Sequence, residues 1–322
     1  MVVGAAVLAF VAVACTADLG TFGGTYGGAA DVNDAGTIVG YSAMPDGKLH
    51  AFVRQPLGAL VDLGTGSRTQ STAHAINDKG VVVGSTADKA SGPPIQTPFV
   101  WTAAGGLTEL ALPPGYLSAW AIDINDAGVI AVNAGRPSTD AWVYNSTTGA
   151  YAPLPGLGGT FEQAAAIAPD GTVVGTATTS TGVEHAVTWD ATTHAITDLD
   201  AGKAGSSAAT GINAHGVVVG WSNSIGTPEA YRWTAGARTT IGVGRADAIN
   251  DDGVIVGVGK TATGDDVAHL WHPSANVSYD FAGVASGGSL EATAINSTGT
   301  AVGTAGSLAA SVPARFDAYT AP

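Results

Sequence analysis

The chain has 322 residues, of which 45% are hydrophobic and 12% charged, and its 46 glycines and 15 prolines are typical of a folded, turn-rich protein. Twelve basic and 26 acidic residues give a formal net charge of −14, so nucleic acids and anionic membrane surfaces would be repelled. The negative charge leaves cationic ligands, neutral sugars and metal ions open as ligands. The single cysteine, Cys15, excludes an internal disulfide and a cysteine-rich zinc cluster.

Residues 1–15 allow two interpretations. The apolar run from Val2 to Ala14 is too short for a transmembrane helix but suits the core of a signal peptide. The sequence "AVAC", which ends at Cys15, is a weak form of a lipoprotein cleavage box and predicts a lipid anchor there. No basic residue precedes the run, so the alternative is an extra buried strand over "AVLAFVAV". We expect no transmembrane span, and one folded domain over residues 16–322.

From residue 18 onward, one motif recurs along the whole chain. "AINDKGVVVG" at 75–84 returns in variant forms, and a catalytic motif would normally occur only once. The glycine of this Asn-Asp-x-Gly element recurs every 37 to 48 residues, at Gly36, Gly80, Gly128, Gly171, Gly216, Gly253 and Gly299. Seven units of this length indicate a propeller or a solenoid.

Each unit contains four short strand patterns in the same order. A small-residue segment ends in Ile-Asn, a valine run follows the turn, an alternating segment ends in an aromatic residue, and an Asp-Leu-Gly segment comes last. No segment keeps a helical period over several turns. The sequence therefore predicts an all-β, seven-bladed β-propeller with four-stranded blades, and a parallel β-helix is the second choice.

The Asp-Leu-Gly segments predict how the ring closes. They lie at Asp18, Asp62, Glu109, Pro153, Asp198, Ile241 and Asp280, so the first copy precedes the first unit and the last unit has none of its own. We expect the N-terminal strand to complete the last blade, which would leave no open sheet edge between the chain ends.

The Asn-Asp-x-Gly element is interpreted as a turn between the first two strands of each blade. Asparagine and aspartate hydrogen-bond nearby backbone N–H groups, and glycine adopts the positive φ of a tight hairpin. A calcium site is the alternative, but the spacing of a calcium loop is missing. The carboxylate is assigned to Asp34, Asp78, Asp126, Asp170 and Asp251, with Ala214 and Ser297 replacing it in two units.

Aromatic residues end the third strand in six units, and we interpret them as packing between blades. They are Trp101, Tyr144, Trp189, Trp233, Trp271 and Phe316, and Arg54 in the first unit is the exception. Two histidines, His50 and His185, share a repeat position and indicate packing or hydrogen bonding. His269 and His272 are three residues apart on one strand and make a poor metal pair.

The chain resembles the bacterial HAF-repeat proteins, described as probable extracellular repeats. The resemblance depends on "DLGTFGGTYGGAADVNDAGTIVG" at 18–40, on "HAF" at 50–52 and on the repeated Ile-Asn-Asp-x-Gly-x-Val-Val-Gly, and it covers nearly the whole chain from Asp18. It implies a protein exported to the cell envelope or outside a bacterium. It supplies no activity and no catalytic residues.

A ligand site is predicted where the repeat is least regular. Loops that enter each first strand and loops between second and third strands should share one face, and the first strands should line an axial channel. The candidate ligand-binding residues at its mouth are Tyr26, His74, Trp120, Gln163, Arg245, Asp247 and Glu291. Aromatic faces beside hydrogen-bonding groups suit a saccharide or a small polar molecule, while the alternative is that these side chains only solvate the mouth.

Three functions follow as hypotheses: a ligand-binding module, a propeller lyase, hydrolase or isomerase, and a structural or partner-binding surface protein. For an enzyme, the catalytic candidates are His74, Asp247 and Glu291, acting as acid, base or metal ligands. Known nucleophile and zinc motifs are missing from the sequence. We expect no organic cofactor, a divalent cation such as calcium as an open alternative, and a monomer.

Overall fold

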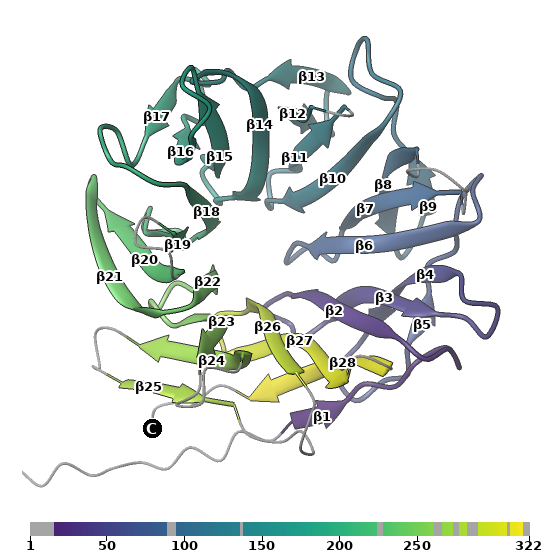
Figure 1. The fold of residues 1–322 in the computed structure, drawn as a ribbon. Coiled ribbons are helices and arrows are strands. Elements are labelled where there is room, and N and C mark those ends of the chain that lie inside the picture. The colour runs from purple at the N-terminus through teal and green to yellow at the C-terminus, as the bar shows by residue number, and fades with distance from the viewer. Residues whose placement is uncertain are drawn as a thin grey trace, which may run out of the picture.

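The computed structural model describes residues 16–88, 95–135, 138–223, 228–260, 266–272, 277–281, 289–307 and 310–317. Within these ranges the chain forms 28 β-strands and no helix, arranged as seven four-stranded sheets around a central axis (Figure 1). This is the predicted seven-bladed β-propeller. The described part of the chain accordingly contains no apolar helix of membrane-spanning length. The expected signal segment and Cys15 lie outside the described residues.

Each blade runs from an inner strand at the axis to an outer strand at the rim. Blade 1 contains β2 (Gly27–Val32), β3 (Ile38–Ala43), β4 (Leu49–Arg54) and β5 (Val61–Asp62), and blade 2 contains β6 (Gln70–Ile76), β7 (Val82–Ala87), β8 (Gln96–Thr102) and β9 (Gly106–Glu109). Blade 3 contains β10 (Ala119–Ile124), β11 (Val129–Ala134), β12 (Asp140–Asn145) and β13 (Ala150–Pro153), and blade 4 contains β14 (Gly158–Ile167), β15 (Val173–Thr179), β16 (Glu184–Trp189) and β17 (Ile196–Asp198). Blade 5 contains β18 (Ser207–Ile212), β19 (Val218–Ser222), β20 (Glu229–Thr234) and β21 (Ala237–Val243). Blade 6 contains β22 (Arg245–Ile249), β23 (Ile255–Lys260), β24 (Asp266–His272) and β25 (Val277–Asp280). Blade 7 contains β26 (Ser289–Ile295), β27 (Thr300–Ser307), β28 (Ala310–Asp317) and β1 (Thr16–Asp18).

The ring closes as the Asp-Leu-Gly segments predict. Strand β1 pairs antiparallel with β28, so the N-terminal strand is the outer strand of blade 7. The backbone N–H of Leu19 then donates to Pro313 O at 3.1 Å. The Leu19 side chain is buried in a cluster with blade 1 residues such as Ile38 and Phe52. The first and last blades are therefore joined by both hydrogen bonds and apolar packing.

The asparagine of the repeated turn does more than close its own hairpin. Asn77 Oδ1 accepts the N–H of Val81 at 2.9 Å, and its Nδ2 donates to Asn125 O in the next blade at 3.1 Å. The glycine of this turn, Gly80, has the predicted positive φ, at 74°. The same inter-blade bond is made by six buried asparagines: Asn33, Asn77, Asn125, Asn213, Asn250 and Asn296. We call this set the asparagine girdle.

Blade 4 interrupts the girdle, and it corrects one sequence assignment. Ala168 stands at the asparagine position, and Pro169, not Asp170, stands at the following aspartate position. Asp170 instead accepts the N–H of Thr172 in its own turn at 2.8 Å. In blade 2 the aspartate at this position links two blades, because Asp78 Oδ1 accepts the N–H of Asp34 at 2.8 Å. Blade 4 has Pro169 at this position and cannot form the link.

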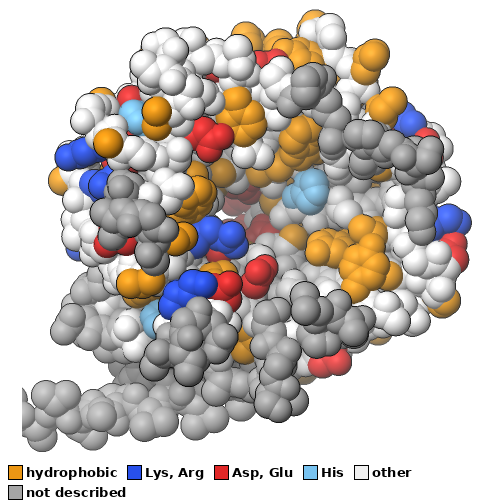
Figure 2. Space-filling view, viewed as in Figure 1, with side chains coloured by type: hydrophobic (Ala, Val, Ile, Leu, Met, Phe, Trp, Pro, Cys, Tyr) orange, Lys and Arg blue, Asp and Glu red, His pale blue; other side chains and the backbone are white. Residues whose placement is uncertain are grey.

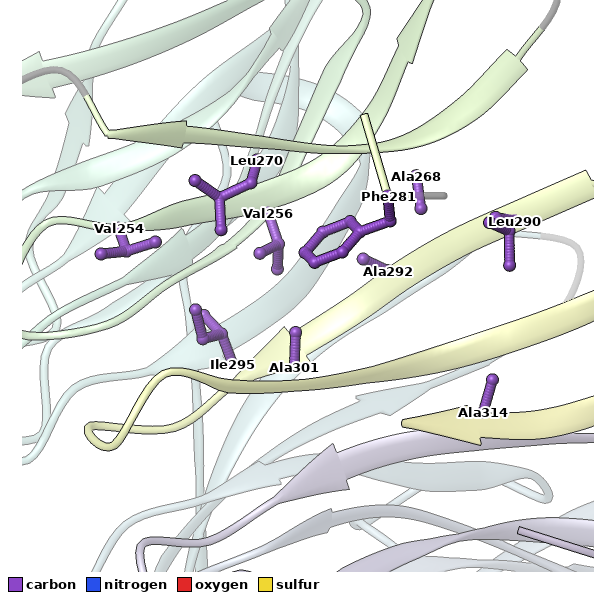
Figure 3. Close-up of a cluster of buried hydrophobic side chains, with 10 residues drawn as sticks. All are labelled: Val254, Val256, Ala268, Leu270, Phe281, Leu290, Ala292, Ile295, Ala301 and Ala314. Atoms are coloured by element: carbon purple, nitrogen blue, oxygen red, sulfur yellow. The ribbon is translucent and has the colours of Figure 1, made fainter. Parts of the chain in front are cut away.

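Apolar side chains fill the spaces between blades. Figure 3 shows one such cluster, in which Leu270 and Phe281 of blade 6 face Ile295 and Ala301 of blade 7. Near the axis the blades converge, and there is room for only a small side chain at the inner-strand position just before the bulge. This position is a buried alanine in every blade: Ala29, Ala73, Ala121, Ala164, Ala209, Ala246 and Ala292. Among the predicted packing aromatics, Trp189, Trp233 and Trp271 are buried, which confirms their role.

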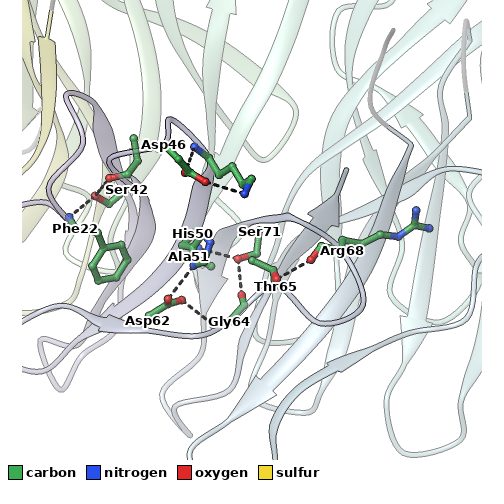
Figure 4. Close-up of polar contacts among 12 residues, drawn as sticks. Phe22, Ser42, Asp46, His50, Ala51, Asp62, Gly64, Thr65, Arg68 and Ser71 are labelled. Carbon is green, nitrogen blue, oxygen red and sulfur yellow. Dashed lines mark hydrogen bonds and ion pairs between the residues drawn. The ribbon is translucent and has the colours of Figure 1, made fainter. Parts of the chain in front are cut away.

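Polar contacts also connect the strands of a blade to one another and to the next blade. His50 Nδ1 lies 2.8 Å from Asp62 Oδ2, which links the His-Ala-Phe segment to the Asp-Leu-Gly strand (Figure 4). The Ser71 hydroxyl of blade 2 accepts the N–H of Ala51 at 2.9 Å and donates to Gly64 O at 2.6 Å. His185 and Asp198 repeat the first contact at 2.9 Å, confirming the hydrogen-bonding interpretation of His50 and His185.

Candidate functional site

The predicted loop arrangement is found on one face of the ring, which we call the loop face. The segment entering β6 contacts the end of β7 through Thr69 N and Ala87 O, at 3.3 Å, and the segment entering β10 contacts the end of β11 through Gly135 N and Ser118 O, at 3.0 Å. Figure 2 shows that the centre of the ring is hollow, with acidic, basic, histidine and hydrophobic side chains around the opening.

A β-bulge in every inner strand shapes this channel. In β6, Ala73 pairs with Gly84 and Ala75 with Val83, so His74 is skipped in the ladder. A bulge turns two consecutive side chains toward the same side, where regular alternation would show only one. An axial cavity of about 210 Å³ is consequently lined by both the bulged residue and its successor in each blade: Ala30, Asp31, His74, Ala75, Ile122, Asp123, Ala165, Ala166, Thr210, Gly211, Asp247, Ala248, Thr293 and Ala294.

Four of the predicted ligand residues form one layer of the inner strands, above the axial cavity toward the loop face. Trp120, Gln163, Arg245 and Glu291 pair with aligned positions of the second strands, namely Asn133, Thr176, Val258 and Thr304. Trp120 is half-buried, while the other three side chains are exposed. Tyr26 stands just before β2, is 39% exposed and bridges to Ser311. We call Trp120, Gln163, Arg245 and Glu291 the mouth layer.

Asp247 lies one layer deeper and is the most distinctive of the predicted residues. Its Oδ1 is 2.6 Å from Arg245 Nε, but its Oδ2 is buried and has no hydrogen-bond partner among the described residues. Burial raises the pKa of Asp247 to about 6, Arg245 opposes the rise, and the charge of Glu291 on the next blade adds to it. The structure thus brings Arg245, Asp247 and Glu291 together on blades 6 and 7.

His74 does not join this group. It projects from blade 2, whose inner strand is not a neighbour of β22 in the ring. Its Nδ1 donates to Ala121 O at 2.5 Å, and its Nε2 lies 3.0 Å from the Thr72 hydroxyl. Burial lowers the pKa of His74, so the neutral ring is favoured. His74 thus lines the same axial cavity as Asp247 from a different blade, and it also links blade 2 to blade 3.

Two channel carboxyl groups were not among the sequence candidates. Asp31 accepts the N–H of Val32 and, from blade 2, the N–H of Ile76, both at 2.8 Å. Asp123 makes the equivalent pair of bonds in blades 3 and 4. Burial raises the pKa of Asp31 to about 6 and that of Asp123 to about 7, the latter also through the charge of Asp31.

A sequence signal for these residues existed, in the aspartate that precedes Val-Asn or Ile-Asn in blades 1 and 3. Strict alternation places that aspartate on the opposite side from the residue before it. Because the bulge is a property of the folded sheet, the pattern alone did not place Asp31 and Asp123 in the channel.

We predict that the protein is more stable at pH 5 than at pH 8. A carboxyl whose pKa is raised by folding binds its proton more tightly in the folded than in the unfolded state, so stability falls as pH rises from about 4 to about 7. Asp31, Asp123, Asp247 and Glu162 all shift in this direction. Calorimetry should show a Tm that falls by several degrees over this range. Asp123→Asn should flatten the slope, and an unchanged slope would contradict the assignment.

The structure offers no preformed metal centre within its described residues, where no three His, Cys, Asp or Glu side chains gather closely enough to hold one ion. His269, one of the two histidines of β24, is instead paired with Asp280, with 2.6 Å between Nδ1 and Oδ1. A second axial cavity, of about 230 Å³, lies at the opposite face among the girdle turns.

Comparison with known proteins finds solved structures of similar fold but no family for this chain. No family model matches the chain, and no curated protein matches its sequence. Among solved structures, an oligogalacturonate lyase in complex with manganese is similar over 95% of this chain and 91% of its own, with a TM-score of 0.59 and 10% identity. Virginiamycin B lyase from Staphylococcus aureus is similar over 95% and 100%, with a TM-score of 0.56 and 13% identity.

A third similar structure, puromycin hydrolase, has a TM-score of 0.56 and 15% identity over 87% of this chain. The match spans half the length of that protein. At these identities the likeness shows the propeller fold alone. The chain is therefore a seven-bladed β-propeller whose structural neighbours include enzymes.

Proposed function

We propose that the loop face binds a small polar molecule, with a saccharide as the favoured class, at the mouth of the axial channel. The observation that carries the proposal is the mouth layer itself, in which one aromatic and three hydrogen-bonding side chains occupy aligned positions of four inner strands. Aromatic rings beside amide, guanidinium and carboxylate groups can hold the apolar face and the hydroxyls of a sugar together.

The opening has two chemically different sides. On blade 3, Trp120 lies near a loop that carries Leu117, which is 80% exposed. The neighbouring blade 2 loop adds Ile95, 52% exposed, and is tied to this loop by Gln96 N and the Ser118 hydroxyl at 3.0 Å. On blades 6 and 7 the side chains are charged. An asymmetric opening of this kind supports a ligand with one apolar face and one polar face.

Replacement of the aromatic side chain provides the test. Trp120→Ala should weaken binding of a saccharide identified by calorimetric screening by about tenfold or more, because the variant loses the stacking surface. Trp120→Phe should retain part of the affinity. Trp101→Phe on β8, away from the mouth, is the matched control and should bind normally. If no saccharide or polyol binds the native protein, or if Trp120→Ala binds like it, the proposal is wrong.

One observation favours catalysis as a second candidate function. Asp247, whose pKa is raised to about 6, lies beside Glu291, so one of two neighbouring carboxyl groups can carry a proton near neutral pH. Turnover of a bound oligosaccharide that disappears in both Asp247→Asn and Glu291→Gln would support a propeller hydrolase or lyase. Recovery of unaltered ligand after prolonged incubation would contradict catalysis and support binding without turnover.

A further inference from the structure

The axial cavity below the mouth layer is rich in hydrogen-bond acceptors. Three carboxyl groups line it, from Asp31, Asp123 and Asp247, and its lining contains no lysine or arginine. The nearest guanidinium, on Arg245, is 46% exposed in the mouth layer and pairs with one oxygen of Asp247 only. The other oxygen, Asp247 Oδ2, is buried and has no hydrogen-bond partner in the part of the chain that the structure describes.

The side-chain hydrogens of this cavity are already donated elsewhere. Thr210 donates its hydroxyl hydrogen to Ala246 O at 2.8 Å, and Thr293 donates to Ala29 O at 2.9 Å. His74 donates its Nδ1 hydrogen to Ala121 O, as described above. With the carboxyl groups ionised, the lining side chains therefore present acceptors to the cavity and no free donor.

We propose that this cavity binds the protonated amine of a small organic ligand, which gives the ligand of the proposed function a positive charge. The inference depends on the proposed function, because it assigns the charged end of the molecule held at the mouth. An ammonium group has three donors and no acceptor, which complements a cavity lined by the acceptors of three carboxyl groups. A volume of about 210 Å³ admits such a group with a short alkyl or polyol stem.

Several charged groups act on the cavity. His74 lies in its wall, Arg245 and Glu291 lie above it, and four carboxylates surround the second cavity at the opposite face: Asp34, Asp78, Asp126 and Asp251. Apart from Arg245, these groups are acidic or favour the neutral state, so the field along the axis attracts a cation. An ammonium fits better than a bare metal ion, because the described carboxyl groups do not converge in threes.

Binding should be linked to proton release. A cation that enters the cavity stabilises the ionised carboxyl groups, so protons leave as it binds and the affinity increases from pH 5 to pH 8. The probe must stay protonated over this range, which an alkyl amine does.

The test compares two matched pairs of probes by calorimetry: glucamine with sorbitol, and benzylamine with benzyl alcohol. In at least one pair the amine should bind about tenfold more tightly than its neutral partner at pH 7, with proton release that depends on the buffer. Asp247→Asn should remove most of that preference. The matched control is Asp266→Asn on the same blade, where Asp266 is 57% exposed and paired with Lys260, and it should keep the preference.

The outcomes separate the two proposals. Equal affinity for an amine and its neutral partner, or a preference that survives Asp247→Asn, would overturn the cation assignment and leave the proposed function intact. Competition by calcium or manganese at concentrations below those of the amine would reassign the cavity to a metal ion. Failure of all four probes to bind would contradict the cation assignment, whereas the proposed function would fail only if the saccharide screen were also empty.

Discussion

Removal of residues 1–19 is expected to open the ring and to lower the Tm by about 6 °C. The deletion takes away β1 and with it the ladder to β28, the bond from Leu19 N to Pro313 O and the buried Leu19 side chain. Burial of a leucine contributes about 2 kcal/mol and each hydrogen bond about 1 kcal/mol. A loss of about 4 kcal/mol corresponds to about 6 °C for a chain of 322 residues, since the entropy of unfolding is about 2.1 cal/mol/K per residue.

The matched control is a deletion of residues 1–15, which keeps β1. It should leave the Tm unchanged, whereas the longer deletion should also shift the protein toward oligomers in size-exclusion chromatography. The reason is that β28 becomes an unpaired sheet edge, which other chains can pair with. Two deletions with the same Tm, or a longer deletion that stays fully monomeric at the native Tm, would show that β1 does not hold the ring together.

Asn77→Ala is expected to cost about 2–4 kcal/mol, because it leaves two buried backbone groups without partners. The variant loses the bond to Val81 N inside the turn and the bond to Asn125 O in blade 3. The Tm should fall by several degrees, measured by calorimetry at constant pH.

Asn145→Ala serves as the matched control for this variant. Asn145 is exposed, and its Oδ1 accepts the N–H groups of Thr147 and Thr148 within one turn, at 3.0 and 3.1 Å. Because water can replace those bonds, the loss should stay below about 1 kcal/mol. If both variants lose the same stability, the bond between blades contributes nothing beyond a local turn, and the girdle is no more than six separate hairpin turns.

The repeat was enough to predict the architecture. A unit of four short strands cannot bury both faces of its sheet alone, so seven units with one motif order must pack on one another. The position of Asp18 before the first unit even predicted which strand closes the ring. These features are local or periodic, and periodicity is visible in a sequence.

The candidate site was predicted only in part. Trp120, Gln163, Arg245 and Glu291 were found because they break the repeat at one aligned position, and the structure places them in one layer. His74 and Asp247 line one axial cavity from different blades, an arrangement that a sequence position does not reveal because it does not tell which blades face each other across the axis.

The number of blades, the order of strands, the turn chemistry and the closure all follow from the amino-acid sequence. The content of the channel follows only from the folded ring: the bulge that turns Asp31 and Asp123 inward, the asparagine bonds from blade to blade, and the surroundings of Asp247. Hairpins and apolar faces are specified by neighbours along the chain, whereas the direction of a bulged side chain and the charges it meets depend on residues tens to hundreds of positions away.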